Sequence, residues 1–100
     1  MKPPSYTTTT KLWLWEGKGA WYFVTIDVEI AQQIKEMYGY LKAAWGSIPV
    51  ILTIGDSTWK TSLFPDKKGG GFLAPIKAEI RKREKLTEGD LVTILITGQV

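Results

Sequence analysis

The sequence predicts one mainly β domain, a six-stranded β-barrel built from two ββαβ halves with two short helices. Three observations predict this fold. The chain has 100 residues, the size of a single domain, and 44% of them are apolar, as is ordinary for a globular protein. Short segments rich in β-branched and aromatic residues alternate with turns that contain glycine. The same order of elements occurs twice, and each half is too short to bury its apolar faces alone.

The first half begins with a strand pair. Residues 1–5 contain two prolines and no apolar run, so they are expected to form a loose tail before a single domain over residues 6–100. Residues 6–15 are rich in threonine and aromatic residues and predict the first strand. The glycine-containing loop at residues 16–19 then predicts a hairpin that returns along a second strand, over residues 20–26.

A helix and a third strand complete the first half. Apolar side chains recur at helical spacing over residues 28–38. Asp27 precedes them and can cap the first turn, and Gly39 follows them and can end the helix. The apolar residues 47–54 predict the third strand.

The second half repeats this order. Residues 58–64 predict a strand, and residues 72–76 predict a short one, in which Pro75 indicates an edge or a bulge. A basic helix is expected over residues 77–85. Residues 91–97 predict the closing strand.

An offset of fifty residues aligns the two halves. KGAWYFVTIDVEI at residues 18–30 lies over KGGGFLAPIKAEI at residues 68–80, with five identities in thirteen positions. Residues 48–55 likewise resemble residues 91–98. Shared periodicity alone could produce such a match, but the loop glycines also agree, so we interpret it as an internal duplication. A pseudo-two-fold axis, a barrel complete within one chain and a monomer are then expected.

The two helices are not expected to be equivalent. Ile34 in the first helix is matched by Glu84 in the second. The first helix is therefore predicted to bury the longer apolar stripe, and the second to be more exposed.

Four segments carry a family resemblance. WEGKGAWYFVTI, SIPVILTIG, TWKTSLFPDKKGGGFLAPIKAEIRK and LTEGDLVTI together resemble the bacterial family catalogued as domain of unknown function 1905, from about Leu12 to Ile96. The resemblance implies a barrel of the double-split type, a fold shared with DNA-binding transition-state regulators and antitoxins. Some relatives carry a second domain of the bacteriocin-protection type. The resemblance implies no reaction and no functional residues.

The composition argues against several kinds of site and location. The chain contains neither cysteine nor histidine, so disulfides are excluded and zinc, haem and iron lose their commonest ligands. No phosphate-loop or calcium-loop motif occurs, and we predict no cofactor and no metal. Residues 1–5 lack the apolar core of a signal peptide, and no apolar run approaches the roughly 20 residues of a membrane span. A cytoplasmic protein without membrane contact is expected.

The five tryptophans are many for so short a chain. Trp13 and Trp15 share one face of a predicted strand, as do Trp21 and Phe23 on the next. Large aromatic side chains favour the core, but these could instead line a slot for a flat apolar ligand. The candidate ligand-binding residues are Trp13, Trp15, Trp21, Trp59, Lys60, Ser62 and Lys77.

Two polar groupings bear on catalysis and nucleic-acid binding. Lys60 and Ser62 share a strand face, as a serine nucleophile and its lysine base would, but no further catalytic motif accompanies them. A basic cluster on the second helix could contact phosphates, although glutamates interrupt it and the net charge is only +3. Its residues are Arg81, Lys82, Arg83 and Lys85. Weak or no specific DNA binding is expected.

A non-catalytic binding or regulatory module for a protein or a small apolar ligand is the function that the sequence favours. It requires no catalytic residues, and none are assembled. Two alternatives stay open: a small cofactor-free enzyme with an aromatic-lined pocket, and, by analogy of fold, a weak nucleic-acid-binding module.

Overall fold

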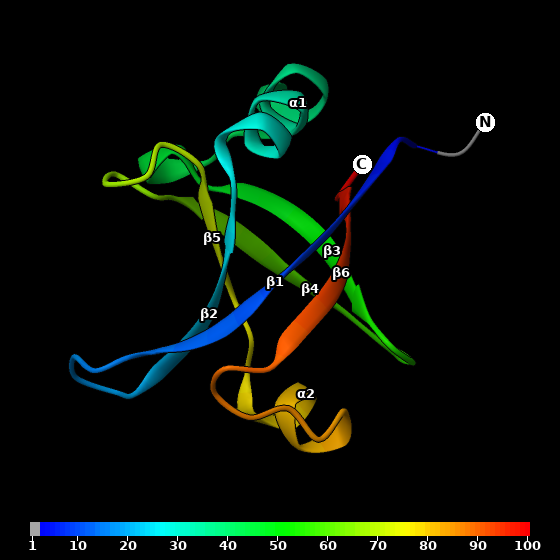
Figure 1. The fold of residues 1–100 in the computed structure, drawn as a ribbon. Coiled ribbons are helices and arrows are strands. Elements are labelled where there is room, and N and C mark those ends of the chain that lie inside the picture. The colour runs from blue at the N-terminus through cyan, green and yellow to red at the C-terminus, as the bar shows by residue number, and fades with distance from the viewer. Residues whose placement is uncertain (1–2) are drawn as a thin grey trace.

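The computed structural model describes residues 3–100, in which six strands close into one antiparallel barrel (Figure 1). The order around the barrel is β1-β2-β5-β4-β3-β6. The strands are β1 (Ser5–Trp15), β2 (Trp21–Ile26), β3 (Ile48–Ile54), β4 (Ser57–Pro65), β5 (Phe72–Pro75) and β6 (Leu91–Gly98). The helices are α1 (Val28–Tyr38) and α2 (Ala78–Arg83), and two 3₁₀ turns, Gly39–Leu41 and Ala44–Gly46, connect α1 to β3. The predicted fold class is confirmed.

Several element boundaries differ from the predicted ones by one or two residues, and two of the differences concern the tail and the second helix. Ser5, expected in the tail, belongs to β1 and pairs with Thr97 of β6, while Met1 and Lys2 lie outside the described residues. The second helix is shorter than predicted, because the chain turns at Lys85 into the left-handed region with φ 57°.

The strand order does not change when the two ββαβ halves are exchanged. β1, β2 and β3 then take the places of β4, β5 and β6, and the same ring results. Val24 of β2 lies directly opposite Ala74 of β5, the residue fifty positions later. This register is what the predicted pseudo-two-fold axis requires, and all six strands come from one chain. The origin of the halves by duplication stays a prediction.

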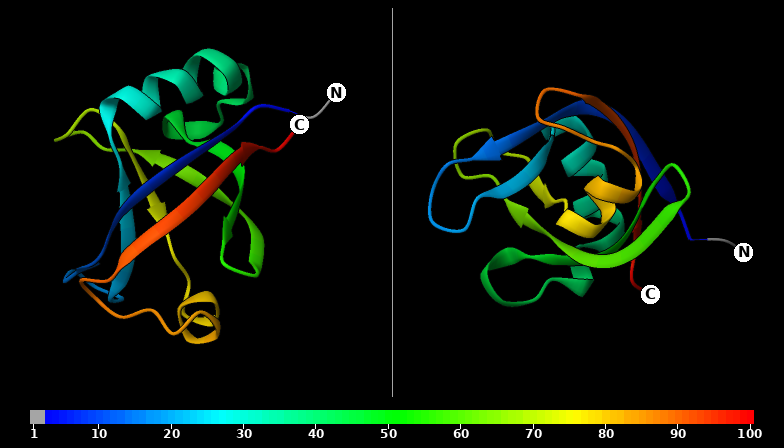
Figure 2. Two further views of the ribbon diagram at one scale, coloured as in Figure 1. Left: turned by 45° about the vertical axis from the view of Figure 1, so that its right-hand side comes forward. Right: turned by 90° about the horizontal axis from the view of Figure 1, so that it is seen from below.

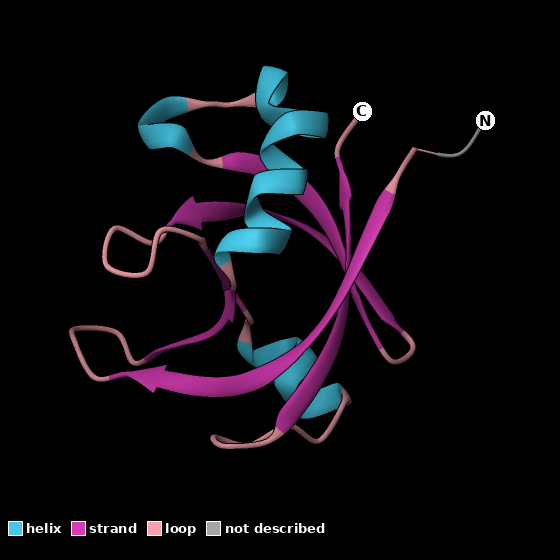
Figure 3. Cartoon of the chain, turned by 45° about the horizontal axis from the view of Figure 1, so that its top comes forward, coloured by secondary structure: helices cyan, strands magenta, loops and turns pink. Residues whose placement is uncertain are grey.

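The helices cover opposite ends of the barrel (Figures 1 to 3). Asp27 caps α1 as predicted, since its Oδ1 accepts a hydrogen bond from the Ile30 amide at 3.0 Å. α1 buries Ala31, Ile34 and Tyr38, whereas α2 buries Ile80 alone, so the predicted asymmetry is confirmed. Of the helices in residues 3–100, none has the length and apolar character that crossing a bilayer requires.

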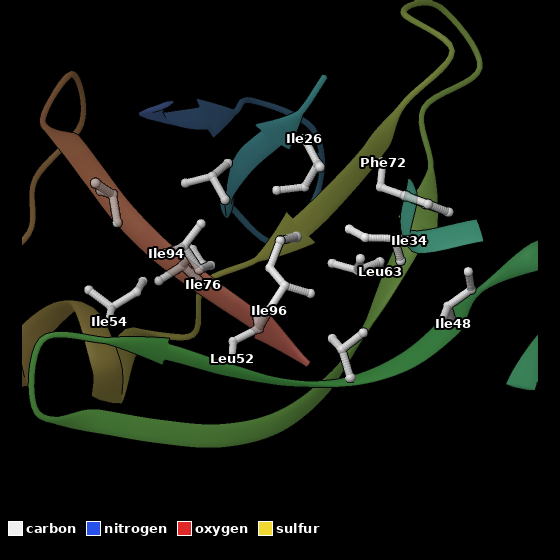
Figure 4. Packing of buried hydrophobic residues seen from close by; sticks show 14 of the residues in the cluster. Ile26, Ile34, Ile48, Leu52, Ile54, Leu63, Phe72, Ile76, Ile94 and Ile96 are labelled. Atoms are coloured by element: carbon white, nitrogen blue, oxygen red, sulfur yellow. The ribbon is translucent and has the colours of Figure 1, made fainter. Parts of the chain in front are cut away.

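The core inside the barrel is mainly aliphatic (Figure 4). Trp59, 8% exposed, is the one tryptophan of the core, whereas Trp15 is 45%, Trp21 53% and Trp45 93% exposed. Of the two alternatives for the tryptophans, the core therefore holds for Trp59, whereas Trp15, Trp21 and Trp45 lie at the surface. Two features explain the outward tryptophans of β1. The segment Leu12–Trp15 is apolar on both faces, so one apolar face must point outward. A barrel of six strands also has a narrow interior, which branched aliphatic side chains fill.

One seam of the barrel opens beside β5. This strand is short, and among the described residues it pairs with β4 only through Phe64 and Pro65. Pro75 ends β5, and its ring nitrogen has no hydrogen to donate to a further partner. Pro75 thus lies at an edge, as predicted, and residues 57–62 of β4 have no strand beside them on that side.

Tyr38 anchors the chain ends to α1. Its side chain is 1% exposed, its hydroxyl donates to the carbonyl oxygen of Pro4, and its ring packs so closely against Gly98 that no Cβ fits there. Burial raises the pKa of Tyr38 above the ordinary value of 10.0.

Alkaline pH should therefore reduce stability through Tyr38. The folded state holds this proton more tightly than the unfolded state does. The stabilisation is complete below the unfolded pKa and is lost as the pH rises through the folded pKa. We expect the free energy of unfolding, measured in urea from about pH 9 to pH 12, to decline less steeply in Tyr38→Phe than in the wild type. Tyr40→Phe, at a side chain 74% exposed, is the control and should follow the wild type. Equal slopes for the wild type and Tyr38→Phe would contradict this role.

Candidate binding surfaces

Six apolar side chains gather on the outside of the barrel and form what we call the aromatic face. They surround a shallow hollow of about 380 Å³. Strand pairing explains their proximity, because Trp13 lies opposite Phe23 and Trp15 lies opposite Trp21. The members of the aromatic face are Trp13, Trp15, Trp21, Phe23, Phe64 and Leu73.

The rings of the aromatic face contact one another. The ring centroids of Trp13 and Phe23 are 5.3 Å apart, and those of Trp21 and Phe23 are 6.2 Å apart with nearly parallel planes, at 11°. The indole Nε1 of Trp13 donates to Thr25 Oγ1 at 2.9 Å. These contacts restrict the orientation of the rings.

The margin of the aromatic face is cationic. A neighbouring hollow of about 390 Å³, lined in part by Trp13 and Trp15, also contains Lys67 and Lys68. Lys11, exposed and two residues before Trp13, lies on the same face of β1. Asp66 is the one carboxylate lining this neighbouring hollow, and its Oδ1 accepts the Lys68 amide at 3.2 Å.

A second recess, the seam cleft, lies where β4 and β5 separate. Its volume is about 270 Å³. Its walls come from β2 and the loop before it, from the stretch of β4 that has no described partner on the β5 side, and from the end of β5 through the first part of α2. The side chains that matter for its chemistry are Trp21, Tyr22, Trp59, Lys60, Lys77 and Arg81.

Arg81 is held in place at the seam cleft. Its guanidinium carbon lies 3.7 Å from the centroid of the Tyr22 ring, and its Nε donates to the Ile76 carbonyl oxygen at 3.0 Å. Lys77, also in the cleft wall, lies 3.7 Å from Glu79 in an exposed ion pair that contributes little.

Comparison with known families gives a match. The family described as Domain of unknown function (DUF1905) matches residues 9–96. The chain belongs to the DUF1905 family. The family resemblance of the sequence is thereby confirmed, and the match includes both the aromatic face and the seam cleft. A comparison with curated proteins finds no match.

The predicted ligand-binding residues of this DUF1905 domain divide between the two surfaces. Trp13 and Trp15 belong to the aromatic face, and Trp21 lines both surfaces. Trp59, Lys60 and Lys77 line the seam cleft. Ser62 lines neither surface, so the structure does not bring it into a site with the other predicted residues.

The residues of the predicted basic cluster have different surroundings in the DUF1905 domain, with Arg81, Lys82 and Arg83 in α2 and Lys85 just beyond its end. Arg81 turns into the seam cleft. The Nη2 atom of Arg83 lies 2.8 Å from Glu79 Oε1, and Glu84 accepts a hydrogen bond from Ser57 Oγ at 2.6 Å. Lys82 and Lys85 remain exposed.

The predicted ligand-binding set omits several side chains that the DUF1905 domain places at these surfaces. Phe23, Phe64 and Leu73 complete the aromatic face. Tyr22 belongs to the seam cleft, and so does Arg81, which was expected as a nucleic-acid contact. Strand alternation could have indicated Phe23, which shares a face with Trp21, and Phe64, which shares a face with Lys60 and Ser62. No local pattern indicates the others.

Acidic clusters are absent from the described part of the DUF1905 domain. Within residues 3–100, no three carboxylates lie close enough together to hold a metal ion. The side chains that line the two surfaces are mainly aromatic rings and cations.

Proposed function

We propose that this DUF1905 domain is a non-catalytic binding module that docks a protein partner through its aromatic face. The observation that supports the proposal is the outward placement of the six apolar side chains, with Trp15 and Trp21 each about half exposed. Contiguous apolar patches of this kind on a small domain are typical of interaction sites. Tryptophan is also enriched among the residues that dominate the binding energy of protein interfaces.

The shape of the aromatic face favours a protein over a small molecule. Sites for small ligands usually enclose most of the ligand surface. Here the rings form a shallow hollow on the barrel exterior, which continues past Phe64 and Pro65 toward the exposed ring of Trp45. A surface this open suits a partner that brings its own apolar side chains.

The charges at its margin specify the partner further. Lys67 and Lys68 line the hollow beside the rings, Lys11 lies on the same face of β1 as Trp13, and the whole chain carries a net charge of +3. A partner segment with apolar side chains flanked by carboxylates complements this arrangement. A second copy of the chain is a less suitable partner, because its lysine-rich margin would lie against the same margin of the first copy and repel it.

Selection from a random peptide library displayed on phage, with the immobilised domain as bait, tests the proposal. We expect the enriched peptides to combine aromatic or branched apolar residues with Asp or Glu. Synthetic peptides of that composition should bind in calorimetry, and more weakly at high salt. An enriched set without carboxylates, or no enrichment, would contradict the proposed partner. Concentration-dependent dimerisation through the aromatic face would instead identify a second copy as its occupant.

We also propose, from the sequence, that the protein is bacterial, cytoplasmic and monomeric, and that its two halves arose by internal duplication. The β2–β5 register supports the duplication.

A further inference from the structure

We infer that the seam cleft is a second, separate binding site, and that it takes a small aromatic carboxylate. The inference does not depend on the aromatic face, although Trp21 borders both surfaces. Three features carry it: the sign of the charges in the cleft, the fixed position of Arg81, and the aromatic walls.

All the charged side chains that line the cleft are cationic. They are Lys60, Lys77 and Arg81, and no carboxylate is among the lining residues. The nearest described carboxylate in contact with them, Glu79, lies 3.7 Å from Lys77 and is shared with Arg83. Three cations around one recess repel one another, and an anion bound between them would relieve that repulsion.

Arg81 is oriented in advance for an anion. Its Nε bond to Ile76 and its contact with the Tyr22 ring fix the plane of the guanidinium. Among the described residues these contacts do not use its two terminal amino groups. A guanidinium with free amino groups binds a carboxylate through two parallel hydrogen bonds, and its fixed position reduces the entropy lost on binding.

The remaining walls select a small planar body. Trp21 and Trp59 supply aromatic surface, and Pro75 and Ile76 supply aliphatic surface. The volume of about 270 Å³ lies just below the usual range for drug-sized ligands, roughly 300–1,000 Å³. One ring with one carboxylate fits these limits.

Benzoate and its neutral analogue benzamide are the probes for the test. Both are titrated into the ¹⁵N-labelled full chain, and NMR follows the indole of Trp59 and the Nε of Arg81. We expect benzoate to shift both signals and to bind at least about tenfold more tightly than benzamide. Arg81→Gln should weaken benzoate binding about 10- to 100-fold, the scale of hydrogen bonds to a charged group, and bring it near the benzamide level.

Three variants keep the test decisive. Arg83→Gln removes a cation from the same helix but not from the cleft, and should leave benzoate affinity unchanged. Lys60→Gln alters an exposed side chain, so folding is retained, and affinity should fall about threefold. Trp15→Ser changes only the aromatic face and should have no effect here, which separates this inference from the proposed function. Equal binding of benzoate and benzamide, or equal losses in Arg81→Gln and Arg83→Gln, would overturn the inference.

Discussion

Phe72→Ala is expected to lower the free energy of unfolding by about 3–5 kcal/mol, the usual loss when a buried phenyl ring is removed. Phe72 is 1% exposed and lies opposite Ile26 on β2 and Pro65 on β4. It belongs to the same buried cluster as Ile34 of α1, and Lys35 of that helix lies over its ring, 5.4 Å from the centroid. The ring therefore connects three strands to a helix. Domains are commonly stable by about 5–15 kcal/mol, so urea unfolding should show a large shift of the midpoint.

Leu73→Ala is the matched control for that experiment. Leu73 is the next residue of β5, and its side chain points to the aromatic face. Because it is only half buried, its truncation should cost clearly less than that of Phe72. A loss of stability in Leu73→Ala as large as in Phe72→Ala would mean that the inner and outer faces of β5 are wrongly assigned.

The double variant Trp15→Ser/Trp21→Ser is expected to lose at least about 100-fold in affinity for the selected peptides. Each indole is a candidate anchor, and a single anchor of this kind contributes about 2 kcal/mol or more. The two residues lie opposite each other in the β1–β2 ladder, so the double change removes one connected patch. Calorimetric titration of the wild type and the variant with one acidic apolar peptide measures the effect.

Stability is the control for this variant. Both indoles are about half exposed, and a cross-strand aromatic pair contributes roughly 0.2–1 kcal/mol. We therefore expect urea unfolding to change by about 1 kcal/mol while binding is lost. Retained binding, or a loss of stability on the scale of Phe72→Ala, would show that these rings serve the fold instead of a partner.

Local patterns in the sequence were enough to predict the scaffold. The threonine- and aromatic-rich segments became β1 and β2, and Asp27 caps α1 because its spacing to the first apolar turn is that of an N-cap. The fifty-residue offset predicted a pseudo-two-fold axis, and the register in which Val24 lies opposite Ala74 agrees with it. Pro75 correctly indicated an edge.

Which side of β1 faces inward could not be predicted from the sequence. The segment Leu12–Trp15 alternates leucine with tryptophan, so both faces are apolar and a period of two does not separate them. Burial favours the larger ring only where space allows. Leu12 is fully buried and Trp15 is 45% exposed, which shows that the interior accommodates the smaller side chain. The exposed rings are thus a property of the closed barrel.

The seam cleft depends on pairing between distant strands. It exists because β5 ends at Pro75 while β4 continues, and because α2 then places Arg81 against Tyr22. Tyr22 and Arg81 are far apart in the chain, so no local pattern relates them. In the sequence, the basic residues around Arg81 resemble an exposed face of a helix. Only the closed barrel brings Lys60, Lys77 and Arg81 around one recess.

If the partner docks on the aromatic face, its binding must change the chemical shifts of the indole N–H groups there, which NMR measures. A ¹⁵N-labelled sample is titrated with one acidic apolar peptide from the selection. We expect the indole signals of Trp13 and Trp15 to shift and broaden in proportion to binding, while that of Trp59, buried behind the seam, stays in place. A peptide that binds and shifts Trp59 but leaves Trp13 and Trp15 unchanged would show that the aromatic face is not the docking site.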